Sequence, residues 1–279
     1  MKRIVFSFVS LLATVVAAAQ VKLPAPSPTQ TINQDFGMSS IELTYSRPSL
    51  KGRKMIGNAD PYNVVWRTGA NAATRIRFND PVDILGNKVD TGTYVIYTIP
   101  QKDGDWTFIL NRGINNWGVD GYKQSEDVFR GKVRTAYDLP KLETFTMVFS
   151  DLKPESCQLR IMWDNFALFV PIKTDVKEKV RAQIEAGMKT DKQPYWQAAQ
   201  FYAEYDRNNV KALDMINKAI AQNIKSNPFY MVHYKAKIQK DLGDKAGAIA
   251  SANESIRMAK EAKNGDYVRL NEKLIAEIK

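Results

Sequence analysis

Hydrophobic and polar residues change their spacing near residue 175, and this change divides the chain into two halves. Before residue 175, apolar and polar residues alternate in short runs, as in residues 41–46 and 74–78, and turn residues separate the runs. After residue 175, apolar residues recur at every third or fourth position, which is typical of amphipathic helices. The pattern therefore predicts a β-rich domain over residues 27–172 and a helical domain over residues 175–279.

The first half contains about ten short runs of β-branched and aromatic residues. Turn signals such as Gly86-Asn87 and Asp103-Gly104 separate these runs, and no stretch between them is long enough for a crossover helix. Short strands joined by tight turns are typical of an antiparallel sandwich or barrel. We predict an antiparallel β-sandwich followed by helices, so the whole chain belongs to the α+β class.

The second half shows a repeat in the spacing of its small residues. Ala212 and Ala219 form a pair that Ala248 and Ser255 repeat 36 residues later. This interval is close to the ~34-residue period of tetratricopeptide repeats, in which small residues let the two helices of a unit pack closely. Residues 193–263 therefore resemble two degenerate tetratricopeptide repeats, followed by a capping helix over residues 266–279.

Other positions match this repeat less completely. Trp196 occupies the large aromatic position of the first helix, and Ala236 fills its small position in the second unit. The counterpart of Ala236 in the first unit is Gln200, which departs from the pattern. Small residues on paired helices also occur in plain helical bundles, which are the alternative. The resemblance implies a concave surface that takes a protein or peptide partner.

The first residues have the three parts of a secretory signal peptide. Lys2 and Arg3 precede an apolar run over residues 4–17, and small residues end at Ala19. The apolar run is shorter than the ~20 residues that span a bilayer. We predict that residues 1–19 are a signal peptide and that the protein works in the periplasm or outside the cell. A buried N-terminal helix is the alternative.

The chain carries a formal net charge of +10, and two of these charges lie in the predicted signal peptide. The other basic residues are spread along the chain, so a solvated basic surface explains them and no nucleic-acid partner is predicted. The excess permits an anionic ligand, and Trp66 and Trp117 could stack on a glycan ligand. No later segment is long and apolar enough to predict a membrane span.

The single cysteine and the single histidine exclude several kinds of site. Cys157 lacks a partner for an intramolecular disulfide, and its alternating run predicts a packed thiol on the inward face of a strand. His233 lies in the helical half, away from the turn-rich half where a catalytic triad would need it. The sequence has no zinc spacing and no nucleotide-binding or hydrolase motif, so we predict no metal, no cofactor and no catalytic residue.

Several segments of the β-rich half match a known family in order and spacing. They are Tyr45-Ser46-Arg47-Pro48, Lys51-Gly52-Arg53-Lys54, Val65-Trp66-Arg67-Thr68-Gly69-Ala70-Asn71, Trp106, Asn111, Trp117-Gly118 and Glu126-Asp127-Val128. On these segments, residues 28–172 resemble the domain-of-unknown-function family 2911, which occurs in exported bacterial proteins. The resemblance implies a β-sandwich, with a C-terminal helical extension in some members, and it implies no activity.

The segment between residues 47 and 71 is rich in Arg, Lys, Gly and Asn and is the candidate ligand site. Arginine binds carboxylate, sulfate and phosphate through paired hydrogen bonds, and a glycine lets a ligand approach the backbone. The candidate ligand-binding residues are Arg47, Arg53, Trp66, Arg67, Asn71 and Trp117. In the alternative interpretation these residues brace a long loop, with the arginines bonded to carbonyls and the tryptophans in the core.

The patterns together predict a non-enzymatic binding or scaffold protein. It would have a protein-interacting helical module and a polar or anionic ligand site on the β-domain. A carbohydrate-active or other hydrolytic enzyme on the β-domain is the alternative, because two carboxylates that are distant in sequence leave no motif. A purely structural envelope protein is a third hypothesis.

Overall fold

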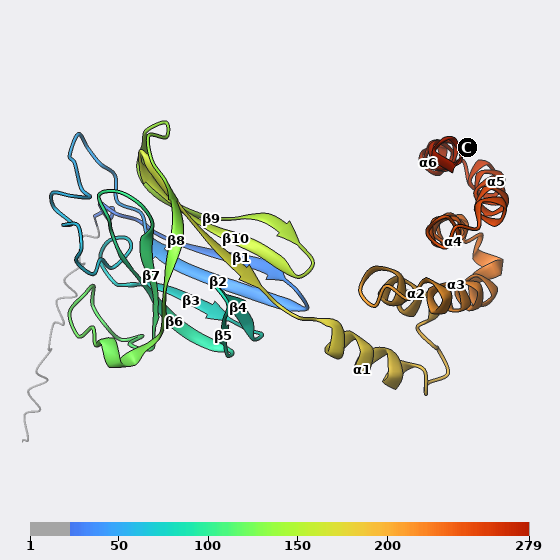
Figure 1. The fold of residues 1–279 in the computed structure, drawn as a ribbon, viewed down its shortest axis with the longest axis horizontal. Coiled ribbons are helices and arrows are strands. Elements are labelled where there is room, and N and C mark those ends of the chain that lie inside the picture. The colour runs from blue at the N-terminus through green and yellow to red at the C-terminus, as the bar shows by residue number, and fades with distance from the viewer. Residues whose placement is uncertain (1–22, 279) are drawn as a thin grey trace, which may run out of the picture. The chain divides into compact units, whose positions relative to one another are not determined.

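The computed structural model describes residues 23–278 as a β-domain followed by six α-helices (Figure 1). This confirms the α+β class and the order of the two parts. The predicted signal peptide, residues 1–19, lies outside the described residues. By internal contacts the chain divides into two compact units, and the second contains the helices together with the strand ends at residues 35–39 and 152–157.

The strands form one continuous antiparallel sheet. Their order is β1-β2-β3-β6-β7-β8-β11-β10-β9, and the short β4 pairs with β5 and with β11. The strands are β1 (Thr29–Phe36), β2 (Ser39–Ser46), β3 (Thr74–Phe78), β4 (Val82–Ile84), β5 (Asn87–Val89), β6 (Gly92–Ile99), β7 (Trp106–Asn111), β8 (Asp127–Ala136), β9 (Leu142–Lys153), β10 (Ser156–Asp164) and β11 (Phe166–Lys173).

The segment that follows β2 brings the sheet close to a closed barrel. Ser49 forms an antiparallel bridge with Thr144 of β9. The Leu50 amide donates to the Glu143 carbonyl at 2.9 Å, which continues the same pairing. The first part of the sheet therefore meets its last strand, and the sheet is nearly barrel-shaped. The division into two facing layers that defines a sandwich remains a prediction.

Aromatic rings fill the interior of this sheet. Trp66 bridges to Thr98 of β6, and its ring stacks on that of Trp163 with centroids 6.1 Å apart. Phe145 and Trp106 meet the Trp66 ring edge-on at 5.5 and 6.3 Å. Burial of large apolar side chains is the main favourable term in folding, so Trp66 anchors the long segment between β2 and β3 in the core.

Strand β6 is buried on both faces, whereas an antiparallel strand often has one solvated face. The loop between β7 and β8, residues 112–123, covers its outer face. The Tyr97 hydroxyl donates to the Gly118 carbonyl at 3.0 Å, and the Tyr122 ring packs against the Tyr97 ring with centroids 4.9 Å apart. The loop is therefore held against the sheet and does not extend freely from it.

The helices are α1 (Lys177–Gly187), α2 (Tyr195–Glu204), α3 (Asn209–Asn223), α4 (Phe229–Asp241), α5 (Lys245–Glu261) and α6 (Gly265–Ile278). Helix α2 packs against α3, α4 against α5, and α6 against α5. The small residues Ala212, Ala219 and Ala248 are fully buried in this module. The side chains of Asn208 and Asp244 cap α3 and α5 by accepting backbone amides of the first turn.

Candidate functional site

One end of the β-domain contains a cavity of about 690 Å³. The β6–β7, β8–β9 and β10–β11 turns lie at this same end because successive antiparallel strands reverse direction. These three turns line the cavity together with the segment between β2 and β3. The volume falls within the range of roughly 300–1,000 Å³ that is common for small-molecule sites.

Aromatic side chains form the apolar part of the cavity lining. Trp106 and Phe166 are buried, and their ring centroids lie 4.6 Å apart. The Trp106 indole N–H donates to the Tyr137 hydroxyl at 2.9 Å, and that hydroxyl donates to the Gly104 carbonyl at 2.7 Å. Burial raises the pKa of Tyr137, so the phenol stays protonated at neutral pH and keeps this connection. Hydrogen bonds therefore hold the Trp106 and Tyr137 rings in place.

The cavity wall formed by the segment between β2 and β3 folds tightly on itself. The Asp60 amide donates to the Met55 carbonyl at 2.9 Å, and the Gly57 amide donates to the Asp60 carbonyl at 2.8 Å. Gly57 has φ of 82°, and a Cβ atom there would lie 2.3 Å from the Tyr62 ring. Glycine is required at this position because the Tyr62 ring, which lines the cavity, lies directly against its backbone.

Six charged side chains surround the cavity, and they come from all four of its loops. They are Lys54, Lys102, Asp103, Asp138, Lys141 and Asp164. Within residues 23–278, the side chains of these six form no ion pair and no hydrogen bond with the protein. Charged groups around a cavity that have no protein partner are available to a ligand.

Two of the predicted ligand-binding residues, Arg47 and Arg53, bond to the chain itself. Arg47 donates from Nε to the Phe145 carbonyl at 3.2 Å and from a terminal nitrogen to the Thr146 hydroxyl at 2.9 Å. Arg53 donates to two backbone carbonyls of its own loop, each at 3.0 Å. Arg47 thereby joins the end of β2 to β9, which is the bracing role that the alternative interpretation assigns to these arginines.

Arg67 and Asn71 lie together on the same segment. The Arg67 guanidinium donates to the Asn71 carbonyl at 3.1 Å and lies against Gly118, where a Cβ atom would be 2.6 Å from Nη1. The side-chain amide of Asn71 donates to the Ser27 carbonyl at 3.3 Å. Burial raises the pKa of the nearby Asp60, and Arg67 partly opposes this rise. The structure thus brings Arg67 and Asn71 to the loop that carries Trp117.

The two predicted tryptophans lie in different environments. Trp66 is 4% exposed and belongs to the aromatic core. Trp117 is 62% exposed at the tip of the β7–β8 loop. None of the six predicted ligand-binding residues lines the cavity, although Lys54 of the same segment does. Their role in binding an anion remains a prediction.

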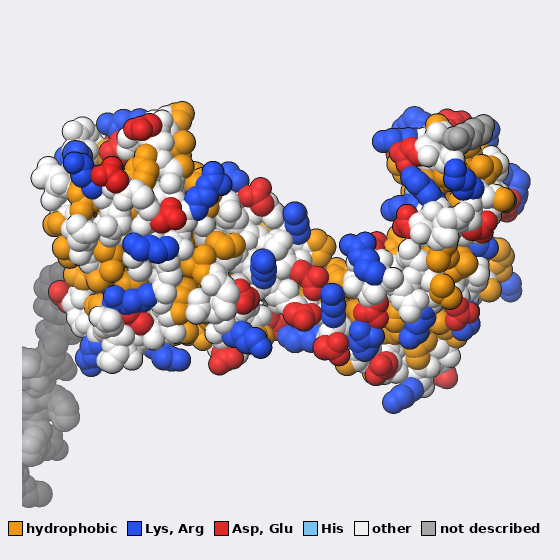
Figure 2. All heavy atoms as spheres, viewed as in Figure 1, with side chains coloured by type: hydrophobic (Ala, Val, Ile, Leu, Met, Phe, Trp, Pro, Cys, Tyr) orange, Lys and Arg blue, Asp and Glu red, His pale blue; other side chains and the backbone are white. Residues whose placement is uncertain are grey.

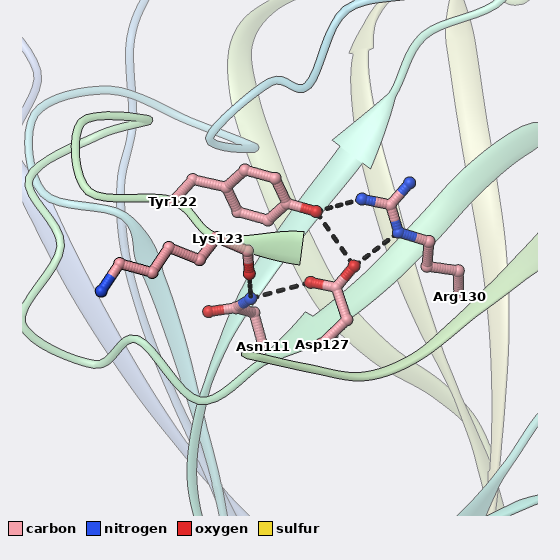
Figure 3. A network of polar contacts seen from close by, with 5 residues as sticks. All are labelled: Asn111, Tyr122, Lys123, Asp127 and Arg130. Atoms are coloured by element: carbon pink, nitrogen blue, oxygen red, sulfur yellow. Dashed lines mark hydrogen bonds and ion pairs between the residues drawn. The ribbon is translucent and has the colours of Figure 1, made fainter. Parts of the chain in front are cut away.

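A polar network around Asp127 fixes both ends of the β7–β8 loop (Figure 3). The Asp127 carboxylate accepts from Asn111 at 2.7 Å, from the Tyr122 hydroxyl at 2.9 Å and from Arg130 Nε at 2.5 Å. Asn111 also donates to the Lys123 carbonyl at 3.0 Å, and Arg130 donates to the Tyr122 hydroxyl. Burial and the bond to Asp127 raise the pKa of Tyr122. Because its carboxylate oxygens are engaged by three side chains, Asp127 acts as a brace.

Sequence reasoning did not identify the cavity, because its charged residues share no motif or period. Asp103-Gly104 indicates only a turn, and the charged residues of the other loops are scattered among uncharged ones. The available signal was topological: consecutive antiparallel hairpins place alternate turns at the same end of a sheet. Using that signal requires the strand order, which includes the non-sequential β8–β11 neighbours.

Several other groups identified in the sequence have definite surroundings. Cys157 is buried, and burial raises its pKa to about 12. His233 on α4 shares a hydrogen bond of 2.8 Å with Asn271, and burial lowers its pKa. Across the described part of the chain, no group of three His, Cys, Asp or Glu residues is placed to hold a metal ion. None of the described helices combines the length and the apolar character needed to cross a bilayer.

Comparison with known proteins places the β-domain in a family. Residues 27–172 match the family model described as Protein of unknown function (DUF2911), and this span contains the sheet except the last residue of β11. No curated protein and no solved structure matches the chain. Function must therefore be inferred from the geometry of this chain.

Proposed function

The chain belongs to the DUF2911 family of proteins of unknown function, and from its geometry we propose that it is a non-enzymatic binding protein of the periplasm or the cell exterior. Its β-domain binds a small polar ligand in the cavity at one end of the sheet. Its helical module contacts a protein or peptide partner. The two functions belong to different units of the chain, so each is supported by its own observations.

The cavity with its six charged side chains carries the proposal for the β-domain. Salt bridges elsewhere on the protein show that charged residues of this chain do pair where neighbours allow it, as in Arg160 with Asp151 at 2.9 Å. At the cavity, lysines and aspartates stand close in sequence, and yet within residues 23–278 their side chains form no ion pair and no hydrogen bond with the protein. An aromatic lining with a few polar groups is the usual composition of a ligand site.

The proposal for the helical module rests on its paired helices and on a groove between α4 and α6. We propose that residues 193–263 are tetratricopeptide-like repeats, because α2–α3 and α4–α5 pack as pairs with buried alanines at the predicted positions. The groove has a volume of about 260 Å³, and Lys237, Leu270 and Lys273 are among its lining residues. Asp241 and Glu277 also line the groove, and Glu277 pairs with Lys240 at 2.6 Å. The lining keeps an excess of one positive charge beside the exposed Leu270, which suits an acidic peptide with an apolar side chain.

A hydrolytic function on the β-domain has one observation in its favour. Three aspartates, Asp103, Asp138 and Asp164, line the same cavity, and glycoside hydrolysis uses a pair of carboxylates. Turnover of a glycan by the wild type, abolished in Asp138→Asn and in Asp164→Asn, would establish this function in place of binding. Both substitutions preserve the left-handed backbone of these positions, which Asn tolerates.

Ligand screening by thermal unfolding of the full-length protein tests the binding proposal. The panel contains anionic metabolites, glycans and short peptides, and a ligand at 100 times its Kd stabilises the folded protein by about 2.7 kcal/mol. We expect at least one compound to raise the Tm of the wild type and not that of Lys102→Gln/Asp138→Asn. Lys88→Gln, an exposed lysine of β5 that does not line the cavity, is the matched control. A panel in which no compound distinguishes wild type from the double variant would refute ligand binding at the cavity.

On the face drawn in Figure 2, basic and acidic side chains are interspersed over the surface of the β-domain and are not gathered by sign. This distribution agrees with the spread of charges along the sequence. A nucleic-acid-binding protein generally presents a continuous basic surface to the phosphate backbone. The proposed ligands are therefore small molecules and proteins.

A further inference from the structure

We propose that the ligand of the β-domain cavity is zwitterionic, and specifically a short peptide with a free amino end and a free carboxylate end. This inference rests on the proposed binding function and specifies the chemistry of the bound molecule. It depends on how the two signs of charge are distributed around the cavity, on its amide and aromatic groups, and on its volume.

Lysines and aspartates line the cavity in equal number. Lys102 and Asp103 are neighbours in the β6–β7 turn, and Asp138 and Lys141 lie in the β8–β9 turn. Two of the contributing turns therefore present one charge of each sign. With three lysines and three aspartates in total, the cavity has no net preference for an anion or for a cation.

This mixture disfavours ligands that carry charge of one sign. A phosphate or sulfate ion that reached the lysines would also face the carboxylates of Asp103, Asp138 and Asp164. A polyamine would face the three lysines in the same way. Like charges brought together at a binding site weaken association, so the favoured ligand carries both signs on one molecule.

The uncharged lining groups identify the connecting part of that ligand. The side-chain amides of Gln101 and Asn165 line the cavity, and each offers donors and an acceptor. In residues 23–278 neither side-chain amide has a hydrogen-bond partner. A peptide group has one donor and one acceptor and is complementary to such an amide. The Tyr62 and Tyr137 rings can also attract an ammonium group placed over their faces.

The volume of the cavity favours a short peptide over a single ion or a free amino acid. At about 690 Å³, the cavity lies in the middle of the range for sites that enclose small organic molecules. A tripeptide places its charged ends several bonds apart, so one end can meet a lysine while the other meets an aspartate from a different turn. In the proposed complex the carboxylate binds Lys102 of the β6–β7 turn, and the ammonium binds Asp138 of the β8–β9 turn.

The test uses the full-length protein and a tripeptide mixture of varied side chains in four forms: both ends free, N-acetylated, C-amidated, and blocked at both ends. Apparent affinity is measured from the Tm shift and confirmed by calorimetry. We expect the free form to bind, each singly blocked form to bind at least tenfold more weakly, and the doubly blocked form to show no binding. Inorganic phosphate and a neutral disaccharide are included at the same concentrations.

Variants assign each end of the peptide to its partner. We expect Lys102→Gln to bind the free and C-amidated forms equally, because this variant lacks the lysine that binds the peptide carboxylate. We expect Asp138→Asn to bind the free and N-acetylated forms equally, because this variant lacks the carboxylate that binds the peptide ammonium group. Lys88→Gln and Asp90→Asn, whose positions do not line the cavity, should behave as the wild type. Unchanged unfolding of each variant without ligand shows that it is folded.

The outcomes separate this inference from the broader proposal. If the doubly blocked peptide or phosphate binds as well as the free peptide, and Lys102→Gln or Asp138→Asn weakens that binding, the cavity is a ligand site but the zwitterionic inference is wrong. The same holds if only the disaccharide binds. If no compound binds, or if the cavity variants bind every compound as the wild type does, both the inference and the proposed binding function of the β-domain fail.

Discussion

Gly118 is the point at which two loops of the β-domain meet. Its φ of 65° lies in the left-handed region, its carbonyl accepts the Tyr97 hydroxyl, and the Arg67 guanidinium lies against its Cα. A side chain at this position would meet both the backbone penalty and the arginine. The residue therefore joins the Arg67 segment to the loop that carries the exposed Trp117.

Substitution of Gly118 by alanine should destabilise the protein through two separable effects. The left-handed backbone contributes about 1–2 kcal/mol, and displacement of Arg67 from its bond to Asn71 adds about 1 kcal/mol. Gly86→Ala is the matched control, because Gly86 has φ of 80° and open space around a Cβ atom. The free energy of unfolding in urea measures both variants. Equal losses in Gly118→Ala and Gly86→Ala would show that contact with Arg67 does not matter.

Individual residues in the candidate segment illustrate how far sequence reasoning reaches. The richness of this segment in Arg, Lys, Gly and Asn singles it out from the other loops, and Lys51, Thr68 and Asn71 in it all have positive φ. It does not reveal whether an arginine faces a ligand or a carbonyl. That choice depends on which strand lies opposite, and for Arg47 the partner Phe145 is 98 residues away. Such long-range pairing is absent from local patterns.

At the scale of elements, alternation and turn signals predict strands well where one face is solvated. β3 and β10 alternate strictly between buried and less buried residues, as expected. β6 does not, because the loop over residues 112–123 buries its outer face. The loop's own sequence is polar and glycine-rich, so its role as a cover depends on the Asp127 network together with the packing of Tyr122 against Tyr97.

The helical elements are predicted more completely, because their contacts are local. Ala248 of α5 is fully buried in a cluster with Ala236 of α4 and Leu274 of α6, as the spacing of small residues implied. A fully buried polar group at this contact is Asn271, whose side chain donates to Ser255 at 2.9 Å and shares a hydrogen bond with His233. Periodicity marked Ser255 as a small residue but did not reveal this polar connection.

Enlarging Ala248 should disrupt the packing between α4 and α5. We expect Ala248→Leu to lower the free energy of unfolding of the helical module by about 1–3 kcal/mol, because a full core has no room for three further carbon atoms. Ala250→Leu is the matched control, since Ala250 lies exposed on the same helix and should change stability by less than about 0.5 kcal/mol. Thermal unfolding followed by circular dichroism at 222 nm measures both. A loss in Ala250→Leu as large as that in Ala248→Leu would contradict close helix packing.

At the scale of the whole molecule, the cavity emerges from topology and not from any one segment. Its walls come from four loops that converge only because the hairpins of a nearly closed sheet turn back at a common end. The α+β class and the change near residue 175 were predictable from hydrophobic periodicity. The near-closure through Ser49 and Thr144 was not, because isolated bridges leave no periodic signal. The candidate ligand site therefore required the structure.

The proposed exported protein relies on packing, since its single cysteine leaves no intramolecular disulfide. Burial raises the pKa of Cys157 from its ordinary value of 9.0 to about 12. The folded state therefore holds the thiol proton more tightly than the unfolded state does. The resulting contribution to stability is complete below pH 9 and is lost progressively as pH rises from about 9 towards 12.

Four measurements on the exported protein test the predicted signal peptide and the packed state of Cys157. N-terminal sequencing of the exported protein should begin at Gln20, as a cut after Ala19 predicts. A reductant should leave the Tm unchanged, and the folded protein should not react with a thiol reagent at pH 8 until denaturant is added.

Between pH 9 and pH 12 the stability of Cys157→Ala should fall less steeply than that of the wild type, because the variant lacks the buried titrating thiol while both proteins keep the same tyrosines. Parallel pH profiles for the two proteins would show that Cys157 ionises equally in the folded and unfolded states, and its burial on β10 would then contribute nothing to alkaline stability.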